Sequence, residues 1–230
     1  MRIRLYIVLL ACVLKAGAQS PFGRVRLFLS SGGTAPKSIF DSCRSRSLMP
    51  DSVLYYEGLV ALKAEKIDVA EVCLAQLKKQ FPDFKEMHYL NGMISFMRKK
   101  YGKSIDEFAL AIESNPLHVN AYFNRSVAYG LLDDYKPAIA DLSKCIELDK
   151  TYALAYYSRA YWFEYTESFD EALKDYESCI KLDPKNYDAY LGMAYIYKNR
   201  KDNTKACEVI KRAQKAGSQI ADEIRAGFCD

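Results

Sequence analysis

Cysteine and histidine are the residues of this chain that could serve as nucleophile, general base or metal ligand. The chain has seven cysteines but only two histidines, His88 and His118. Neither histidine has a cysteine or carboxylate at the spacing of a zinc site. A serine or cysteine nucleophile needs a histidine held nearby as its base, and no such set is visible, nor is a glycine-rich phosphate loop. The sequence therefore predicts a protein that is not an enzyme and that uses no metal and no cofactor.

The first 18 residues have the pattern of a secretory signal peptide. Arg2 and Arg4 form a basic start, residues 5–14 are a short apolar run, and residues 16–18 read Ala-Gly-Ala, an A-x-A cleavage site. The apolar run is too short to span a membrane. We expect an exported chain, periplasmic or secreted, that begins at Gln19 after cleavage. The alternative is a lipobox ending at Cys12, which would anchor the protein to the envelope through a lipid.

Charge argues against a nucleic-acid partner. The full chain has 33 basic and 29 acidic residues, and residues 1–18 contain three of the bases and none of the acids. The exported chain is therefore nearly neutral, and its acids and bases are interspersed. Nucleic-acid binding requires a basic patch or stripe, and we find none.

From residue 51 onward the sequence repeats itself every 34 residues. Within each unit, apolar residues recur at helical spacing, which predicts two amphipathic helices joined by a polar turn. Such a period is typical of stacked helix-pair repeats. The five units abut without insertion and span residues 51–84, 85–118, 119–152, 153–186 and 187–220.

Columns of similar residues fix the register of these units. Prolines near the unit ends should stop a helix, and Pro137 should lie in the first turn of its helix, where its missing N–H costs nothing. Two columns are small, which lets helices cross closely. The proline column is Pro82, Pro116 and Pro184, with Lys150 in the third unit; the small columns are Gly58, Gly92, Ser126, Ala160 and Ala194, then Ala70, Ser104, Ala138, Ala172 and Ala206.

The pattern resembles the tetratricopeptide repeat (TPR) family over residues 51–220. This resemblance implies an all-α fold, a right-handed α-solenoid of five tandem helix-turn-helix repeats with short capping helices. Where the family often has tryptophan, this chain has Leu54, His88, Tyr122, Tyr156 and Tyr190, so we expect His88 in the core. The residues at the family's spacing are Tyr122, Ser126, Tyr129, Tyr135, Ala138, Leu142, Cys145 and Ile146, and Tyr156, Ala160, Phe163, Phe169, Ala172, Tyr176, Cys179, Ile180 and Pro184.

Cysteines in equivalent repeat positions should remain reduced. Cys145 and Cys179 should be about 10 Å apart, the distance between packed helices, whereas a disulfide requires Cα atoms within about 7 Å. We expect both to be buried free thiols. The redox state of Cys43, Cys73, Cys207 and Cys229 stays open.

The ends of a repeat stack need shielding. We interpret residues 19–36 as a flexible leader and residues 37–48 as an N-terminal capping helix, with Phe40 and Cys43 in phase with the array. At the other end, residues 218–228 are expected to form a capping helix. Ser218 would be its N-cap, and Ile220, Ile224 and Phe228 would lie on its inner stripe.

The resemblance also implies a binding surface, the concave face lined by the first helix of each pair. Its expected residues are mainly aromatic or methionine, which suits an apolar or aromatic peptide, either extended or helical. The alternative is that these side chains pack on one another or on a terminal segment of the chain. The expected groove consists of Tyr55, Leu59, Tyr89, Met93, Phe96, Met97, Phe123, Val127, Tyr157, Tyr161, Tyr165, Leu191 and Tyr195.

These expectations favour a non-catalytic scaffold that binds a peptide or protein. TPR proteins that clamp the C-terminal carboxylate of heat-shock chaperones have Lys and Asn where this chain has Tyr55 and Leu59, so that clamp is not expected. The alternative is a self-associating structural element of an envelope assembly, because repeat arrays also stack end to end. The partner's identity and the oligomeric state stay open.

Overall fold

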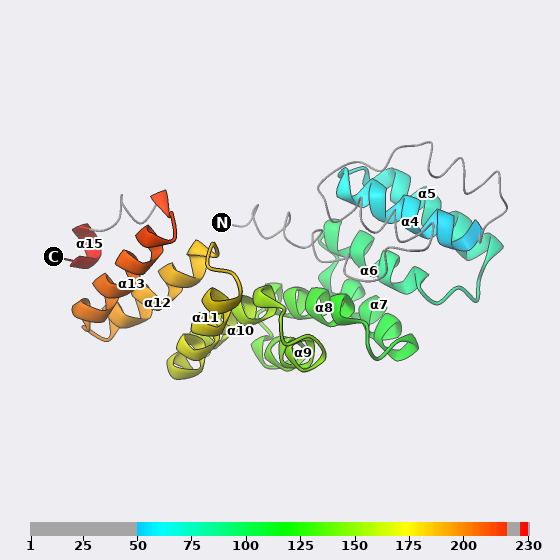
Figure 1. The fold of residues 1–230 in the computed structure, drawn as a ribbon. Helices are drawn as coiled ribbons and strands as arrows, with labels where there is room; N and C mark the ends of the chain where they lie inside the picture. Colours follow the sequence, from blue (N-terminus) through cyan, green and yellow to red (C-terminus); the bar gives the residue numbers. More distant parts are fainter. Residues whose placement is uncertain (1–49, 220–225, 230) are drawn as a thin grey trace. The chain divides into compact units, whose positions relative to one another are not determined.

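The computed structural model describes residues 50–219 and 226–229, and within these ranges the protein has eleven α-helices and no β-strand (Figure 1). The segments expected to be signal peptide, leader and N-terminal cap, including Cys12, Phe40 and Cys43, lie outside the described residues. The helices are α4 (Pro50–Lys63), α5 (Ile67–Gln80), α6 (Met87–Met97), α7 (Tyr101–Ser114), α8 (Val119–Leu131), α9 (Tyr135–Leu148), α10 (Ala153–Tyr165), α11 (Phe169–Leu182), α12 (Tyr187–Asn199), α13 (Asn203–Lys215) and α15 (Ala226–Cys229).

Helices α4 to α13 form five successive pairs, which confirms the predicted all-α solenoid class of helix-turn-helix repeats. The chain divides into two compact units, the first ending at Ala128 and the second beginning at Tyr129. The first unit contains α4 to α7 and most of α8, and the second contains α9 to α13 and α15. Each unit has its own hydrophobic core.

The turn within each pair has the same backbone geometry. One residue there is left-handed, with φ between 57° and 60°. In the second pair, Lys99 N–H donates to Phe96 O and Lys100 N–H donates to Ser95 O, both at 2.8 Å. This is a Schellman motif, which satisfies carbonyl groups at a helix end. The left-handed residues, Glu65, Lys99, Asp133, Glu167 and Lys201, follow one another at intervals of 34.

The second helix of a pair ends differently, next to the proline column. Helices α5, α7 and α11 each end two residues before a proline. The residue between is extended, as for Asn115 with φ −141° and ψ 91°, because proline disfavours helical geometry in its predecessor. Asp149 has nearly the same angles before Lys150, so proline reinforces this ending without being required for it. Pro137 is the third residue of α9, which confirms its predicted place.

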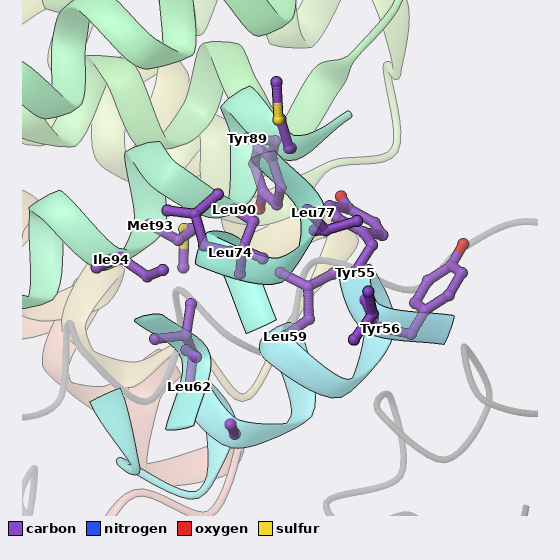
Figure 2. Packing of buried hydrophobic residues seen from close by; sticks show 14 of the residues in the cluster. Tyr55, Tyr56, Leu59, Leu62, Leu74, Leu77, Tyr89, Leu90, Met93 and Ile94 are labelled. Atoms are coloured by element: carbon purple, nitrogen blue, oxygen red, sulfur yellow. The ribbon is translucent and has the colours of Figure 1, made fainter. Parts of the chain in front are cut away.

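In the first unit, leucine and methionine side chains of α4, α5 and α6 meet in one core (Figure 2). Glycines permit the close helix crossings: a Cβ atom on Gly92 would lie 2.6 Å from the Phe108 ring. The two small columns meet here, because Ser104 Oγ donates a 3.0 Å hydrogen bond to Gly92 O. Their predicted close packing is confirmed by the second column, Ala70, Ser104, Ala138, Ala172 and Ala206, whose members are all fully buried.

His88 is less buried than the sequence predicts. Its side chain is 30% exposed, and its Nδ1 lies 2.9 Å from Glu107 Oε2. The other oxygen of Glu107 accepts a hydrogen bond from Asn91. Imidazole is smaller and more polar than the indole common at this position, so His88 sits at the edge of the core, where a carboxylate can reach it.

In the second unit, Arg159 of α10 ties its helix to Asp175 of α11. Its Nε and Nη2 atoms lie 2.6 and 2.9 Å from the two carboxylate oxygens, and its Nη1 donates to Ser143 Oγ at 3.0 Å. Asp175 is 8% exposed as a side chain. A buried carboxylate needs such a partner, because an unpaired charge in the interior is costly.

Candidate binding surface

In the first unit, the side chains expected to line the groove are buried. Tyr89, for example, packs its ring 4.6 Å from that of His118, and its hydroxyl accepts a 2.8 Å hydrogen bond from Asn124. Met97 is partly buried. The remaining seven predicted residues of this unit are each 8% exposed or less, namely Tyr55, Leu59, Tyr89, Met93, Phe96, Phe123 and Val127.

In the second unit, the expected groove residues are open to solvent to a greater degree. Tyr165 is 53% exposed and Tyr195 is 52% exposed, whereas Tyr157, Tyr161 and Leu191 are partly buried. Large exposed aromatic side chains mark interaction surfaces when they gather in a patch. The second unit therefore contains the accessible part of the expected surface.

Three tyrosines form a row along α10: Tyr157, Tyr161 and Tyr165, spaced four residues apart so that they share one helix face. The rings of Tyr157 and Tyr161 are stacked with centroids 6.4 Å apart, and those of Tyr161 and Tyr165 meet edge to face at 5.1 Å. The hydroxyls of Tyr161 and Tyr165 lie 3.0 Å apart. We call these three residues the tyrosine row.

Trp162 and Tyr135 support the outer end of the tyrosine row. Trp162 is 6% exposed, and its ring lies 4.9 Å from Tyr161 and 5.8 Å from Tyr165. Tyr135 stacks on Trp162 at 5.5 Å. Trp162 also fills the space beside Gly130 of α8, where a Cβ atom would lie 2.1 Å from its ring. The sequence analysis missed this support, although Trp162 is the chain's single tryptophan and directly follows Tyr161.

Tyr176 of α11 supports the inner end. Its ring is buried, lies 5.9 Å from that of Tyr157, and rests against Gly192 of α12, where a Cβ atom would meet it at 2.5 Å. Its hydroxyl is hydrogen-bonded to the carboxylate of Glu164. A side chain at position 192 would displace Tyr176, so this glycine maintains the packing beneath the row.

Burial controls the ionisation of this cluster. It raises the pKa of Tyr157, with a further contribution from the charge of Asp188, and it raises the pKa of Tyr161, where the hydrogen bond with Tyr165 adds to the effect. Burial also raises the pKa of the Glu164 carboxyl, against the lowering effect of its hydrogen bond with Tyr176. The phenols of Tyr157 and Tyr161 therefore stay neutral well above physiological pH.

Tyr195 has a neighbour from the C-terminal helix α15. The Phe228 ring packs edge to face on Tyr195 at 5.1 Å. Lys198 Nζ lies 4.9 Å from the centre of the Phe228 ring and donates a 2.5 Å hydrogen bond to Gly227 O. Phe228 is buried, consistent with the inner position expected for it, whereas Ile220 and Ile224 lie outside the described residues.

A disulfide between Cys207 and Cys229 joins α15 to α13, with Cα atoms 4.7 Å apart. Sequence reasoning left both cysteines without a partner. They are 22 residues apart and hold no common repeat position, so their pairing depends on how the chain beyond α13 returns to it.

The remaining thiols of the described residues are buried and form no disulfide, namely Cys73, Cys145 and Cys179. The prediction for Cys145 and Cys179 is confirmed. Burial raises the pKa of Cys179 to about 12, and a thiol that stays protonated is a poor nucleophile. Among the residues described, no group of three histidine, cysteine or acidic side chains could hold a metal ion. No helix in the described ranges is long and apolar enough to cross a membrane.

Three models of the tetratricopeptide repeat family match this chain, over residues 55–118, 119–152 and 166–225. Together they cover well over half of the sequence and fall on the helix pairs described above. The chain belongs to the tetratricopeptide repeat family. A comparison with curated proteins found no match.

Solved structures with the same fold include MamA, at 21% identity and a TM-score of 0.64, covering 74% of this chain and 97% of that one. MamA from Desulfovibrio magneticus RS-1 is 17% identical, with a TM-score of 0.65 and coverage of 73% and 95%. YrrB, described as a TPR protein with an unusual peptide-binding site, is 15% identical, with a TM-score of 0.65 and coverage of 82% and 97%. At these identities the likeness establishes the fold.

Proposed function

We propose that this protein is a non-catalytic scaffold that binds a peptide or protein segment at the tyrosine row of α10. The observation that carries the proposal is the row itself. Tyr165 is half exposed, and its ring is held in place by Tyr161, Trp162 and Tyr135. The solved structure of YrrB, a TPR protein with a peptide-binding site, supports this kind of function for the fold.

Fixed aromatic rings suit binding for an energetic reason. Tyrosine and tryptophan are enriched among the residues that dominate binding energy at interfaces. Association costs less entropy when side chains already occupy their bound positions, and the neighbouring rings restrict the tyrosine row before any partner arrives. The seven buried groove residues of the first unit then have a packing role.

We also propose that the protein is exported, either to the periplasm or out of the cell. The N-terminal pattern of a basic start, an apolar run and an Ala-Gly-Ala site supports this. The Cys207–Cys229 disulfide supports it independently, because disulfides persist in oxidising compartments and are rare in the cytosol. Attachment through a lipid on Cys12 is the alternative, and mass spectrometry of the exported chain distinguishes the two.

The test of function is quantitative capture of partners by tagged protein exported from its native cell. The double variant Tyr161→Ala with Tyr165→Ala should retain its helical circular dichroism and lose at least about tenfold in partner recovery, since each interface tyrosine contributes on the order of 1 kcal/mol or more. Leu182→Ala is the matched control, because Leu182 is also exposed but lies on α11. Equal recovery by the double variant and the control would contradict the proposal.

A further inference from the structure

Glu164 lies on the same helix as the tyrosine row, between Tyr161 and Tyr165 in sequence. Its Oε1 atom is buried and has no hydrogen-bond partner among the described residues, and the carboxylate's neighbour is the hydroxyl of Tyr176. No lysine, arginine or histidine in the described ranges forms an ion pair with it. The row therefore has a partly buried negative charge beside it that this part of the chain does not neutralise.

Other buried carboxylates of the described helices have partners. Asp175 is held at two points by Arg159, and Glu107 is held by His88 and Asn91. An unpaired buried carboxylate destabilises the fold, and burial raises the pKa of Glu164 accordingly. A glutamine at position 164 would have the same shape as Glu164 without its charge. The presence of a carboxylate at this position therefore favours a cationic partner from outside the chain.

Two cations of the second unit, Arg159 and Lys198, are engaged elsewhere. Arg159 binds Asp175 and Ser143. Lys198 donates to Gly227 O and lies over the Phe228 ring. Recruiting either side chain to Glu164 would break these contacts, whereas a cation from a bound segment would break neither of them.

The tyrosine rings provide the second half of a cation site. An ammonium or guanidinium group is attracted to the negative face of an aromatic ring, and the attraction grows when the site excludes water. Glu164 adds to that potential, since its charge acts on Tyr157, Tyr161 and Tyr176. Asp188 of α12 acts on Tyr157 in the same direction. The field requires no direct ion pair, because charges interact strongly across a low-dielectric cluster.

We propose that Glu164 and the tyrosine row form a cation site that binds a lysine or arginine side chain, so that the segment bound by this protein is basic. This inference rests on the proposed function and narrows it from any peptide to a cationic one. The aromatic rings provide the contact area of this cation site, and the Glu164 carboxylate provides its preference for positive charge.

Trp162 allows peptide binding at the cation site to be measured without a label. It is the single tryptophan of the chain, and its ring lies 4.9 Å from Tyr161, so occupancy of the row should change its fluorescence. The probes are three capped synthetic peptides of equal length, identical except for two central residues that are Lys, Gln or Glu. Capped termini keep the end charges out of the comparison.

We expect the Lys peptide to change the Trp162 emission saturably and to bind about fivefold or more tightly than the Gln peptide, with the Glu peptide weakest. Glu164→Gln should remove most of this preference, so that its affinities for the Lys and Gln peptides become similar. Glu171→Gln is the matched control, because Glu171 is an exposed carboxylate in the first turn of α11, and it should retain the preference.

Equal affinities for the Lys and Gln peptides would overturn the proposed cation site. A full charge preference in Glu164→Gln, or no saturable response to the Lys peptide at millimolar concentration, would also overturn it. These outcomes are distinguishable from failure of the proposed function. If all three peptides bind equally and Tyr161→Ala abolishes their binding, the row binds peptides without charge selection. If Tyr161→Ala binds every peptide as tightly as the unchanged protein, the row is not the binding surface.

Discussion

The hydroxyl oxygens of Tyr161 and Tyr165 lie 3.0 Å apart on successive turns of α10. This hydrogen bond fixes an edge-to-face contact between two rings, of which the outer one is half exposed. The pair therefore presents a rigid aromatic surface to solvent, and its rigidity depends on the packing behind it.

Gly130→Ala should destabilise the second unit by about 1–3 kcal/mol, the usual cost of forcing extra atoms into a packed site. The added methyl group would overlap the Trp162 ring and push it toward the tyrosine row. Urea unfolding measures the loss. Gly102→Ala is the control, because no atom lies within 4 Å of a Cβ there. Alanine favours helix over glycine by up to about 1 kcal/mol, so Gly102→Ala should stabilise, and equal effects of the two changes would contradict this account.

Arg159→Met should cost about 3 kcal/mol or more in unfolding free energy, because it leaves Asp175 buried without its partner. The corresponding change in an exposed ion pair should matter little. Glu147→Gln removes the charge that Lys144 contacts at 2.7 Å on the surface of α9, and it should change stability by less than about 0.5 kcal/mol. Both variants are compared by chemical denaturation, and a loss in Arg159→Met no larger than in Glu147→Gln would be inconsistent with a structural role for the buried pair.

Cys229→Ser should lower the unfolding free energy by about 3 kcal/mol, the loop-closure contribution expected for a bridge spanning 22 residues. It should also release α15, so that Tyr195 loses its contact with Phe228 and the C-terminus becomes sensitive to protease. Peptide mapping without reductant should recover residues 207 and 229 in one cross-linked fragment. Alkylation of Cys229 in the unreduced protein would show that the bridge does not form.

Stability should fall as pH rises above about 10. Burial raises the pKa of Tyr157, Tyr161 and Tyr176 in the folded state, whereas phenols of the unfolded chain ionise near 10. In that window the unfolded state has released protons that the folded state retains, so unfolding becomes more favourable with increasing pH. Absorbance of tyrosinate and urea unfolding between pH 9 and 11.5 measure the effect.

The variant Tyr157→Phe with Tyr161→Phe is the control for this pH dependence, since lysines also titrate in the same range. It should have a weaker decline in stability than the unchanged protein. If the two proteins lose stability in parallel, the tyrosine row is not responsible.

The repeat architecture was predictable because each 34-residue unit carries its own signals. Close helix crossings select small residues such as Gly92 and Ser104, and prolines mark the helix ends. The left-handed turn residues were missed because none of the five is glycine; Lys99 and Glu167 adopt φ near 60° without a sequence signature. Their backbone geometry accompanies the Schellman hydrogen bonds, which join backbone N–H and C=O groups and so require no particular side chain.

The accessibility of the binding surface was not predictable from the repeat pattern. Met93, Val127 and Tyr161 hold the same repeat position, yet the first two are buried and the third is partly exposed. Their surroundings differ through particular contacts, such as that of Asn124 Nδ2 with Met93 Sδ at 3.1 Å. Repeat position specifies the helix face, whereas burial depends on neighbours that are distant in sequence.

The most direct measurement replaces Tyr165 with a photoreactive phenylalanine analogue in the exported protein and maps its crosslinks in the native cell by mass spectrometry. The same analogue at Leu182, exposed on α11, is the reference. Binding at the tyrosine row predicts a defined partner segment crosslinked at position 165 and absent at position 182. Crosslinks at 182 alone, or the same products at both positions, would contradict it.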